Sequence, residues 1–168
     1  IPQDRHAEGL VADFDLTENV ALALSRMAEF GSRVMMPWGV LRGEAERIRA
    51  KFEVVAPSIE TRARFLSGGN QQRVIIGREL ALKAPMLVAE NPTRGLDVAA
   101  TSYVQGELLK LASEGVAIVL ISTDLNEVLR LSDSVSVMTK GRMVEVSGAQ
   151  KTREGVGALM LGGGEASN

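Results

Sequence analysis

The residue types that could do chemistry are gathered most densely at positions 66–73, which read Leu-Ser-Gly-Gly-Asn-Gln-Gln-Arg. Two consecutive glycines follow a serine, and a strongly helical run comes next. A helix N-terminus carries unpaired backbone N–H groups and a partial positive charge, and glycines let an anion approach because they have no Cβ. Ser67 would add a hydroxyl donor, so the pattern predicts phosphate binding. The alternative is a plain serine N-cap followed by two loop glycines.

A second group of polar residues follows the apolar run 86–89. Glu90 and Asn91 stand at its end, and Pro-Thr-Arg-Gly-Leu-Asp occupies positions 92–97. A buried strand that delivers acidic and amide groups near a phosphate-facing helix is typical of magnesium–nucleotide sites. Together the two groups indicate a nucleotide site.

These stretches resemble the motifs of ATP-binding-cassette ATPases. Positions 66–73 are similar to the family's signature motif, and 92–97 to the turn and D-loop that follow its Walker B strand. The Asn-Gln-Gln after the glycines and the Arg before Gly-Leu-Asp most resemble the second cassette of tandem-cassette sugar and nucleoside importers. The resemblance runs from residue 1 to about 147. It implies ATP and Mg²⁺ as cofactors, and an opposing cassette and transmembrane permease subunits as partners. It also implies a cytoplasmic location, peripheral to the inner face of the cell membrane through the permease.

In that family the signature motif of one cassette contacts the ATP that is bound to the opposing cassette. The resemblance therefore implies that Ser67, Gly68 and Gly69 bind the γ-phosphate of a nucleotide delivered from outside, with Gln71 and Asp97 at the same interface. Asp97 would also serve as the N-cap of the following helix.

The chain's own nucleotide site departs from the family pattern. Glu90 and Asn91 stand where the family has Asp and a catalytic Glu, and Thr123 stands where its switch loop has His. Glu90 can still bind magnesium, in the first or second coordination shell, but an amide cannot accept a proton from water, and a general base contributes roughly 10² to 10⁴ in rate. Threonine cannot be a cationic contact. We therefore expect poor hydrolysis at this site. Gln3, at the Q-loop position, would touch magnesium and water; the alternative is an exposed leader without a role.

Composition narrows the function further. The chain has 168 residues, no cysteine, and a net charge of −2, so neither a thiolate metal site nor nucleic-acid binding is expected. Its longest apolar run, 116–121, is far shorter than the roughly 20 residues of a membrane helix. The Gly-x-x-x-x-Gly-Lys-Ser/Thr phosphate loop (Walker A) is not in the sequence. We expect a C-terminal piece of a longer cassette that is inactive by itself.

The expected fold class is α/β: an incomplete P-loop NTPase (ABC ATPase) domain with a parallel central sheet and a small helical subdomain. The resemblance divides it into a Q-loop region (1–16), a helical subdomain (17–66), the C-terminal part of the ATPase core (67–147) and a partly disordered tail (148–168). The expected helices are Thr17 to Gly31, then 44–51, 67–83, 97–115 and 124–131, with one short helix in the tail. The expected strands are 86–90 and 116–121, buried on both faces, and a hairpin of 134–138 with 142–146.

Two questions of packing stay open at this point. The family places the phosphate-loop strand between 116–121 and 134–138, so either these two strands pair directly or another chain fills the open edge and the piece self-associates. Trp38 and the methionines before it either pack inside the helical subdomain or face a transmembrane partner. An alternative function is that of a cassette without transport duty, acting as a regulator or scaffold.

Overall fold

The computed structural model describes residues 1–25, 27 and 35–161. The chain divides into two compact units, 1–119 and 120–168. The helices are α1 (Leu16–Leu24), α2 (Trp38–Lys51), α3 (Gly68–Ala81), α4 (Val98–Ser113), α5 (Leu125–Leu131) and α6 (Arg153–Met160), with short turns η1 (Arg5–Gly9), η2 (Ala63–Phe65) and η3 (Gly148–Gln150). The strands are β1 (Met86–Glu90), β2 (Ala117–Ile121), β3 (Ser136–Thr139) and β4 (Arg142–Glu145).

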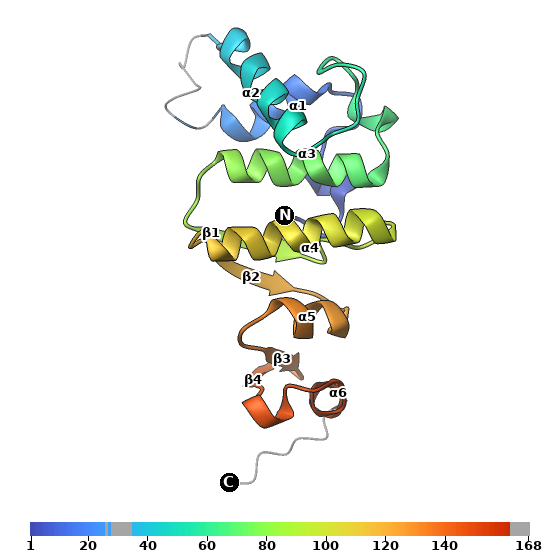
Figure 1. The fold of residues 1–168 in the computed structure, drawn as a ribbon, viewed down its shortest axis with the longest axis vertical. Coiled ribbons are helices and arrows are strands. Elements are labelled where there is room, and N and C mark those ends of the chain that lie inside the picture. Colours follow the sequence, from blue (N-terminus) through green and yellow to red (C-terminus); the bar gives the residue numbers. More distant parts are fainter. Residues whose placement is uncertain (26, 28–34, 162–168) are drawn as a thin grey trace. The chain divides into compact units, whose positions relative to one another are not determined.

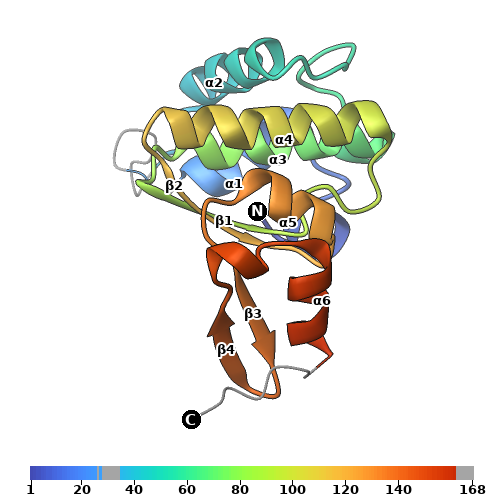
Figure 2. The ribbon, with the colours of Figure 1, turned by 60° about the horizontal axis from the view of Figure 1, so that its bottom comes forward.

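Three helices of the first unit pack around one apolar core. Leu24 of α1, Leu41 and Ile48 of α2 and Ile75 of α3 are almost completely buried there. Such burial removes apolar side chains from water and is the main force that holds short helices together. On its other side α3 runs next to α4 (Figures 1 and 2). The helix that begins at the signature therefore lies between the helical layer and α4.

The start of α1 differs from the sequence expectation. Asp15 is the N-cap, so the helix begins at Leu16 and not at the expected Thr17. The Asp15 carboxylate accepts from the Glu18 amide, and the Glu18 carboxylate accepts from the Asp15 amide. This reciprocal capping box satisfies two amides, whereas Thr17 is buried inside the helix. The helix ends at Leu24 rather than continuing past Met27, and Gly31, the predicted stop, lies outside the described residues.

The exposed apolar residues near the start of α2 also correct a prediction. Trp38 is 46% exposed and Met35 is 77% exposed, so in this chain they do not pack inside the helical subdomain. Trp38 itself begins α2, nearly two turns before the charged part of the helix around Glu44. The exposed side chains leave the alternative prediction, that this surface faces a transmembrane partner.

β1 and β2 form a parallel pair. The backbone of Ile1 extends this ladder, because its amino group donates to the Val88 carbonyl at 2.7 Å and the Glu90 amide donates to the Ile1 carbonyl at 2.9 Å. Gln3 is thereby carried to the end of β1, next to Glu90. The ladder thus joins a segment nearly ninety residues away in sequence to the strand that ends in the candidate metal ligand.

The prediction that both faces of these strands are buried is wrong for this chain. Leu87 and Ala89 are buried, but the alternate side chains of Val88 and Ile121 are 43% and 51% exposed. Successive side chains of a strand point to opposite faces, so one face of the pair is covered and the other is open. An unbroken apolar run does not reveal this, because it looks the same whether one or two faces are covered.

The second unit contains the predicted hairpin. β3 and β4 pair in antiparallel register from Ser136 opposite Glu145 to Thr139 opposite Arg142. Lys140 and Gly141 both have positive φ in the turn, as a tight hairpin requires. α6 lies along the hairpin and closes a small core (Figure 2). Its members are Val135, Val137, Val146, Val156 and Leu159.

The structure tests one of the two expectations for the strands predicted at 116–121 and 134–138, namely that they pair directly with each other. β2 pairs with β1 and β3 pairs with β4, so within the described ranges β2 and β3 belong to different sheets. Direct pairing of the two strands, one of the two expectations, is therefore wrong here. The short tail helix is present as α6, and Gly162–Gly164, predicted to be disordered, lie outside the described residues.

Candidate functional site

The predicted phosphate-binding turn is the N-terminus of α3. Ser67 is the N-cap, and the first amide bonded within the helix is that of Gln71, which donates to the Ser67 carbonyl at 2.9 Å. The amides of Gly68 and Gly69 precede it and have no carbonyl within the helix to bond. Ser67 is exposed and the two glycines are half-buried. The turn therefore presents donors at the surface and is not buried in the core.

Packing restricts position 69 more than position 68, because Gly69 faces a fixed methyl group and Gly68 faces the flexible end of the Arg5 side chain. A Cβ at position 68 would lie 2.8 Å from Nη2 of Arg5, and one at 69 would lie 3.0 Å from Cβ of Ala100 on α4. Both distances are shorter than ordinary contacts. The start of α3 is thus held close to η1 and to α4, and the close approach to α4 depends on the missing side chain of Gly69.

Arg5 is a cation at this turn that the sequence did not single out. Its Nη1 donates to the Arg94 carbonyl at 2.9 Å, and its guanidinium also lies near Gly95, whose φ is 68°. The Nε of Arg5 is buried, and no acceptor for it is found among the described residues. Arg5 therefore places positive charge beside Gly68 and connects the Q-loop segment to the turn after β1. No motif marks it; its contacts exist only once the chain is folded.

Gln3 and Glu90 meet at one side of an open cleft of about 570 Å³. With the Gln3 amide oriented to suit both neighbours, its nitrogen donates to Oε1 of Glu90 at 3.1 Å and its oxygen accepts from Arg94. Asp4, Glu8 and Gly95 complete the lining together with Arg5. The structure thus brings together the two residues predicted to touch magnesium, although Arg94 shares the amide oxygen.

The donor set of this cleft fits Mg²⁺ of the kind that accompanies nucleotides. Such an ion prefers oxygen ligands and takes only one or two from protein, the rest being water and phosphate. Gln3 and Glu90 offer an amide and a carboxylate oxygen, and the described residues contain no cluster of three or more acidic, histidine or cysteine side chains that could hold a metal alone. Binding through the Gln3 oxygen would require Arg94 to move away.

The turn after β1 has a strained backbone at its first residue. Asn91 has φ 42°, in the left-handed region, where asparagine is tolerated better than most residues. Its carbonyl accepts from the Arg94 amide at 3.0 Å, which closes the turn. Asp97 then caps α4, accepting from the Ala100 amide at 2.8 Å, so its predicted capping role is confirmed. The exposed Asp97 carboxylate lies one α4 turn from the Ala100 methyl that faces Gly69.

The chain was compared with protein-family models, known proteins and solved structures. No protein-family model matches the chain. It is 39% identical over 163 residues to the guanosine import ATP-binding protein NupO of Bacillus subtilis (strain 168), covering 96% of this chain and 32% of that protein. It is 38% identical over 170 residues to the glucose import ATP-binding protein TsgD13 of Haloferax volcanii, covering 99% and 31%. The chain thus spans about a third of the length of these relatives.

A solved structure shares the fold. A dimeric post-hydrolysis state of the ATP-binding cassette MJ0796, bound to ADP and Pi, superposes with a TM-score of 0.65 at 29% identity, over 83% of this chain and 60% of that one. The chain belongs to the ATP-binding-cassette ATPases. Its fold is part of the P-loop NTPase fold of that family, as the sequence predicted.

Gln71 of this cassette lies within the fold. Its side chain is only 6% exposed, and its Nε2 donates to the Ala63 carbonyl at 3.0 Å. Its Oε1 is buried and has no partner among the described residues. In this structure Gln71 fastens the first turn of α3 to η2, a contact that the linear motif does not show.

Thr123 belongs to the cassette's second unit. It is exposed and precedes Asp124, which caps α5 by accepting from the Asn126 amide at 2.9 Å. Ser122 donates its hydroxyl to Glu127 at 2.6 Å. The residue that the sequence predicts at the switch position therefore directly precedes the N-cap of α5.

The cassette has a second hollow, away from the signature. It is an open groove of about 490 Å³ between η1, α1 and α3. Much of its lining is apolar, and three charged residues also line it. The apolar residues include Leu10, Val11, Leu22, Met27 and Leu82, and the charged ones are Glu8, Arg78 and Glu79. Leu22 is 48% exposed there. In the described part of the chain no helix is long and apolar enough to cross a membrane.

Proposed function

We propose that the chain is the C-terminal part of a cassette that energises import of a sugar or nucleoside. Its relatives are named as import ATP-binding proteins for guanosine, glucose and xylose. In this proposal the turn Ser67–Gly69 binds the γ-phosphate of ATP held by an opposing cassette, and Asp97 organises the same interface. Gln71, which the sequence placed at that interface, is buried and instead holds the turn to η2. The observation that supports it most directly is the exposed start of α3. There the Ser67 hydroxyl and the amides of Gly68 and Gly69 can donate hydrogen bonds to a ligand.

The chain's own site would bind Mg-ATP in the full-length protein but hydrolyse it poorly. Glu90 and Gln3 supply oxygen ligands for magnesium. Asn91 cannot act as a general base and Thr123 cannot supply a cation. In this proposal the cassette contributes to hydrolysis through its signature turn, Ser67–Gly69, which completes the active site of the opposing cassette.

The test uses the full-length protein with its permease. Replacing Ser67 by alanine removes the hydroxyl donor, and we expect ATP hydrolysis to fall by about tenfold or more, as when one donor to a transition-state oxyanion is lost. Ser113→Ala is the matched control, because Ser113 lies at the end of α4 and donates only to the Lys110 carbonyl. Equal rates for wild type and Ser67→Ala would overturn the proposal.

A permease is the partner that we propose for the groove between η1, α1 and α3. The groove is open and largely apolar, and η1, which lines part of it, begins two residues after Gln3 of the candidate metal site. A partner seated there would touch the same segment that holds the nucleotide site. The exposed Trp38 and Met35 add apolar surface on the same unit. This contact would hold the cassette at the cytoplasmic face of the membrane.

Co-purification tests that contact. Leu22→Glu puts a charge into the groove and should reduce recovery of the permease with the tagged cassette. Leu109→Glu is matched in chemistry and exposure, since Leu109 is 44% exposed on α4, outside the groove. Loss of permease with both variants, or with neither, would contradict a docking site in this groove.

A further inference from the structure

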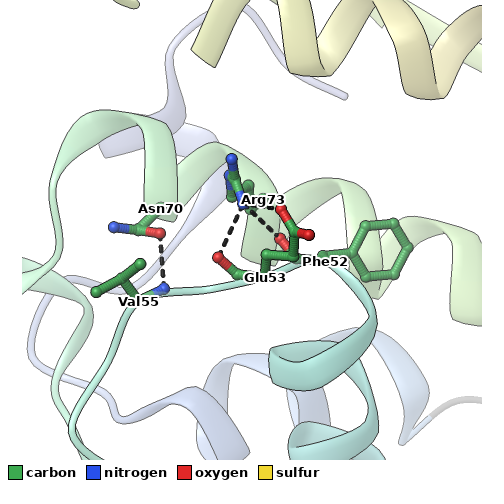
Figure 3. Close-up of polar contacts among 5 residues, drawn as sticks. All are labelled: Phe52, Glu53, Val55, Asn70 and Arg73. Carbon is green, nitrogen blue, oxygen red and sulfur yellow. Dashed lines mark hydrogen bonds and ion pairs between the residues drawn. The ribbon is translucent and has the colours of Figure 1, made fainter. Parts of the chain in front are cut away.

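Asn70 links the candidate phosphate donor to a distant backbone segment. Its Oδ1 accepts from the Val55 amide at 2.8 Å, and its Nδ2 donates to Oγ of Ser67 at 3.0 Å (Figure 3 shows the first of these bonds). The backbone amide of Asn70 also points at Oγ of Ser67, at 3.4 Å. One residue therefore makes two donor contacts to the Ser67 hydroxyl.

These contacts determine which way the Ser67 hydrogen can point. A hydroxyl has two acceptor lone pairs and one donor hydrogen. Asn70 occupies the acceptor side with two N–H groups, so the hydrogen of Ser67 must be donated elsewhere. No acceptor for it is found in the part of the chain that the structure describes, and Ser67 is exposed. The hydroxyl is thus set as a donor facing outward.

The orientation of the Asn70 amide is itself fixed. The Val55 N–H can only donate, so it requires the oxygen of Asn70 on its side and leaves the nitrogen for Ser67. Arg73 holds the same segment one turn further along α3, donating to the carbonyls of Phe52 at 3.1 Å and Glu53 at 2.8 Å (Figure 3). Glu53 has φ 51°, which turns its carbonyl in this direction.

Arg73 is held in turn by α4. Its guanidinium stacks over the ring of Tyr103 with 3.9 Å between Cζ and the ring centroid. The order of positioning runs from Tyr103 through Arg73 to the backbone of 52–55, and from Val55 through Asn70 to Ser67. The part of this order that is hydrogen-bonded throughout runs from the Val55 amide through the Asn70 side chain to Ser67, and hydrogen bonds arranged in such a chain polarise one another.

We propose that Asn70 is a positioning residue that presets the Ser67 hydroxyl as a hydrogen-bond donor to phosphate. The inference rests on the proposed function of Ser67 and adds the reason why asparagine suits this position. Aspartate is the informative replacement, because it can accept from Val55 as asparagine does but has no hydrogen to give Ser67. It would draw the Ser67 hydrogen toward itself and leave the phosphate without that donor.

The experiment is a double-mutant cycle in the full-length protein with its permease, measuring kcat and KM for ATP. Asn70→Asp should lower kcat by about tenfold, similar to Ser67→Ala. In the Asn70→Asp background, Ser67→Ala should cost less than about twofold, because the donor is already lost. Asn70→Ala, which removes the side-chain contacts without adding charge, should show the same non-additivity and serves if the aspartate variant does not fold.

Asn126→Asp is the matched control. Asn126 is exposed in the first turn of α5, so the same chemical change is made at another helix start, and wild-type kinetics are expected. A purely structural role of Asn70 would give additive losses, with Ser67→Ala costing tenfold in every background, and would overturn the inference alone. If Ser67→Ala by itself leaves ATP hydrolysis unchanged, the proposed function falls and the inference with it.

Discussion

Asn91 occupies a backbone conformation that restricts what can replace it. With φ 42°, an asparagine is tolerated, whereas a longer side chain without a local hydrogen bond costs roughly 1 kcal/mol or more. We expect Asn91→Glu to lower the free energy of unfolding by about 1 kcal/mol in chemical denaturation. Asn126→Glu, in a helical first turn where acidic residues are favourable, should lose almost nothing.

The same substitution tests the state of the hydrolytic site. In the full-length protein Asn91→Glu restores the usual residue type, yet we expect ATP hydrolysis to rise only slightly, because Thr123 remains and the backbone is strained. A large loss of ATP hydrolysis would contradict the proposal that the nucleotide site of this cassette already hydrolyses ATP poorly.

Tyr103 is the chain's single tyrosine and offers a clean titration. Burial raises its pKa to about 12, with the nearby Glu107 acting in the same direction. The neutral phenol is therefore favoured in the fold, and this stabilisation is complete below the unfolded pKa of about 10 and is lost as the pH rises through about 12. The absorbance of tyrosinate should show a midpoint near 12, and a midpoint near 10 in a chain still folded by circular dichroism would contradict this.

At this scale the sequence revealed the residues that carry motifs and missed those that position them. Ser67 and Asp97 are where the pattern placed them, at helix N-termini. Arg5 and Asn70 act through contacts with segments 15 to 89 residues away, which no local pattern encodes.

Among the elements, α3 depends on a close approach to α2. A Cβ at Gly77 would lie 2.5 Å from Cγ2 of Ile48 and 2.7 Å from Cδ2 of Phe52. We expect Gly77→Ala to lower the free energy of unfolding by about 1 to 3 kcal/mol through overpacking. Gly106→Ala is the matched control: it lies in α4 with nothing within 4 Å and should gain up to about 1 kcal/mol from helix propensity. Equal changes in the two variants would contradict the close packing of α2 on α3.

Most elements could be predicted because their signals are local. The helix after the signature, the strand 86–90 and the hairpin turn at Lys140–Gly141 follow from caps, apolar runs and turn residues. The end of α1 and the exposure of Val88 could not, because tertiary packing decides how far a helix continues and which face of a strand is covered.

For the molecule as a whole, the cleft at Gln3 and Glu90 has too few groups that could bind phosphate to hold a nucleotide by itself. Gln3 and Glu90 offer oxygen atoms to a metal ion, but the sequence has no phosphate loop that would bind the triphosphate. Isothermal titration of this chain with Mg-ATP should show nothing tighter than about millimolar, where each factor of ten in affinity is about 1.4 kcal/mol. The full-length protein is the control, and micromolar binding by the chain alone would contradict the division of labour proposed here.

The open face of the β1–β2 pair has a practical consequence. It exposes apolar side chains, such as those of Val88 and Val119, to water. Apolar strand surface of this kind promotes association between copies. Purified material should therefore be handled dilute, and its melting temperature compared at several concentrations before any loss of stability is assigned to a substitution.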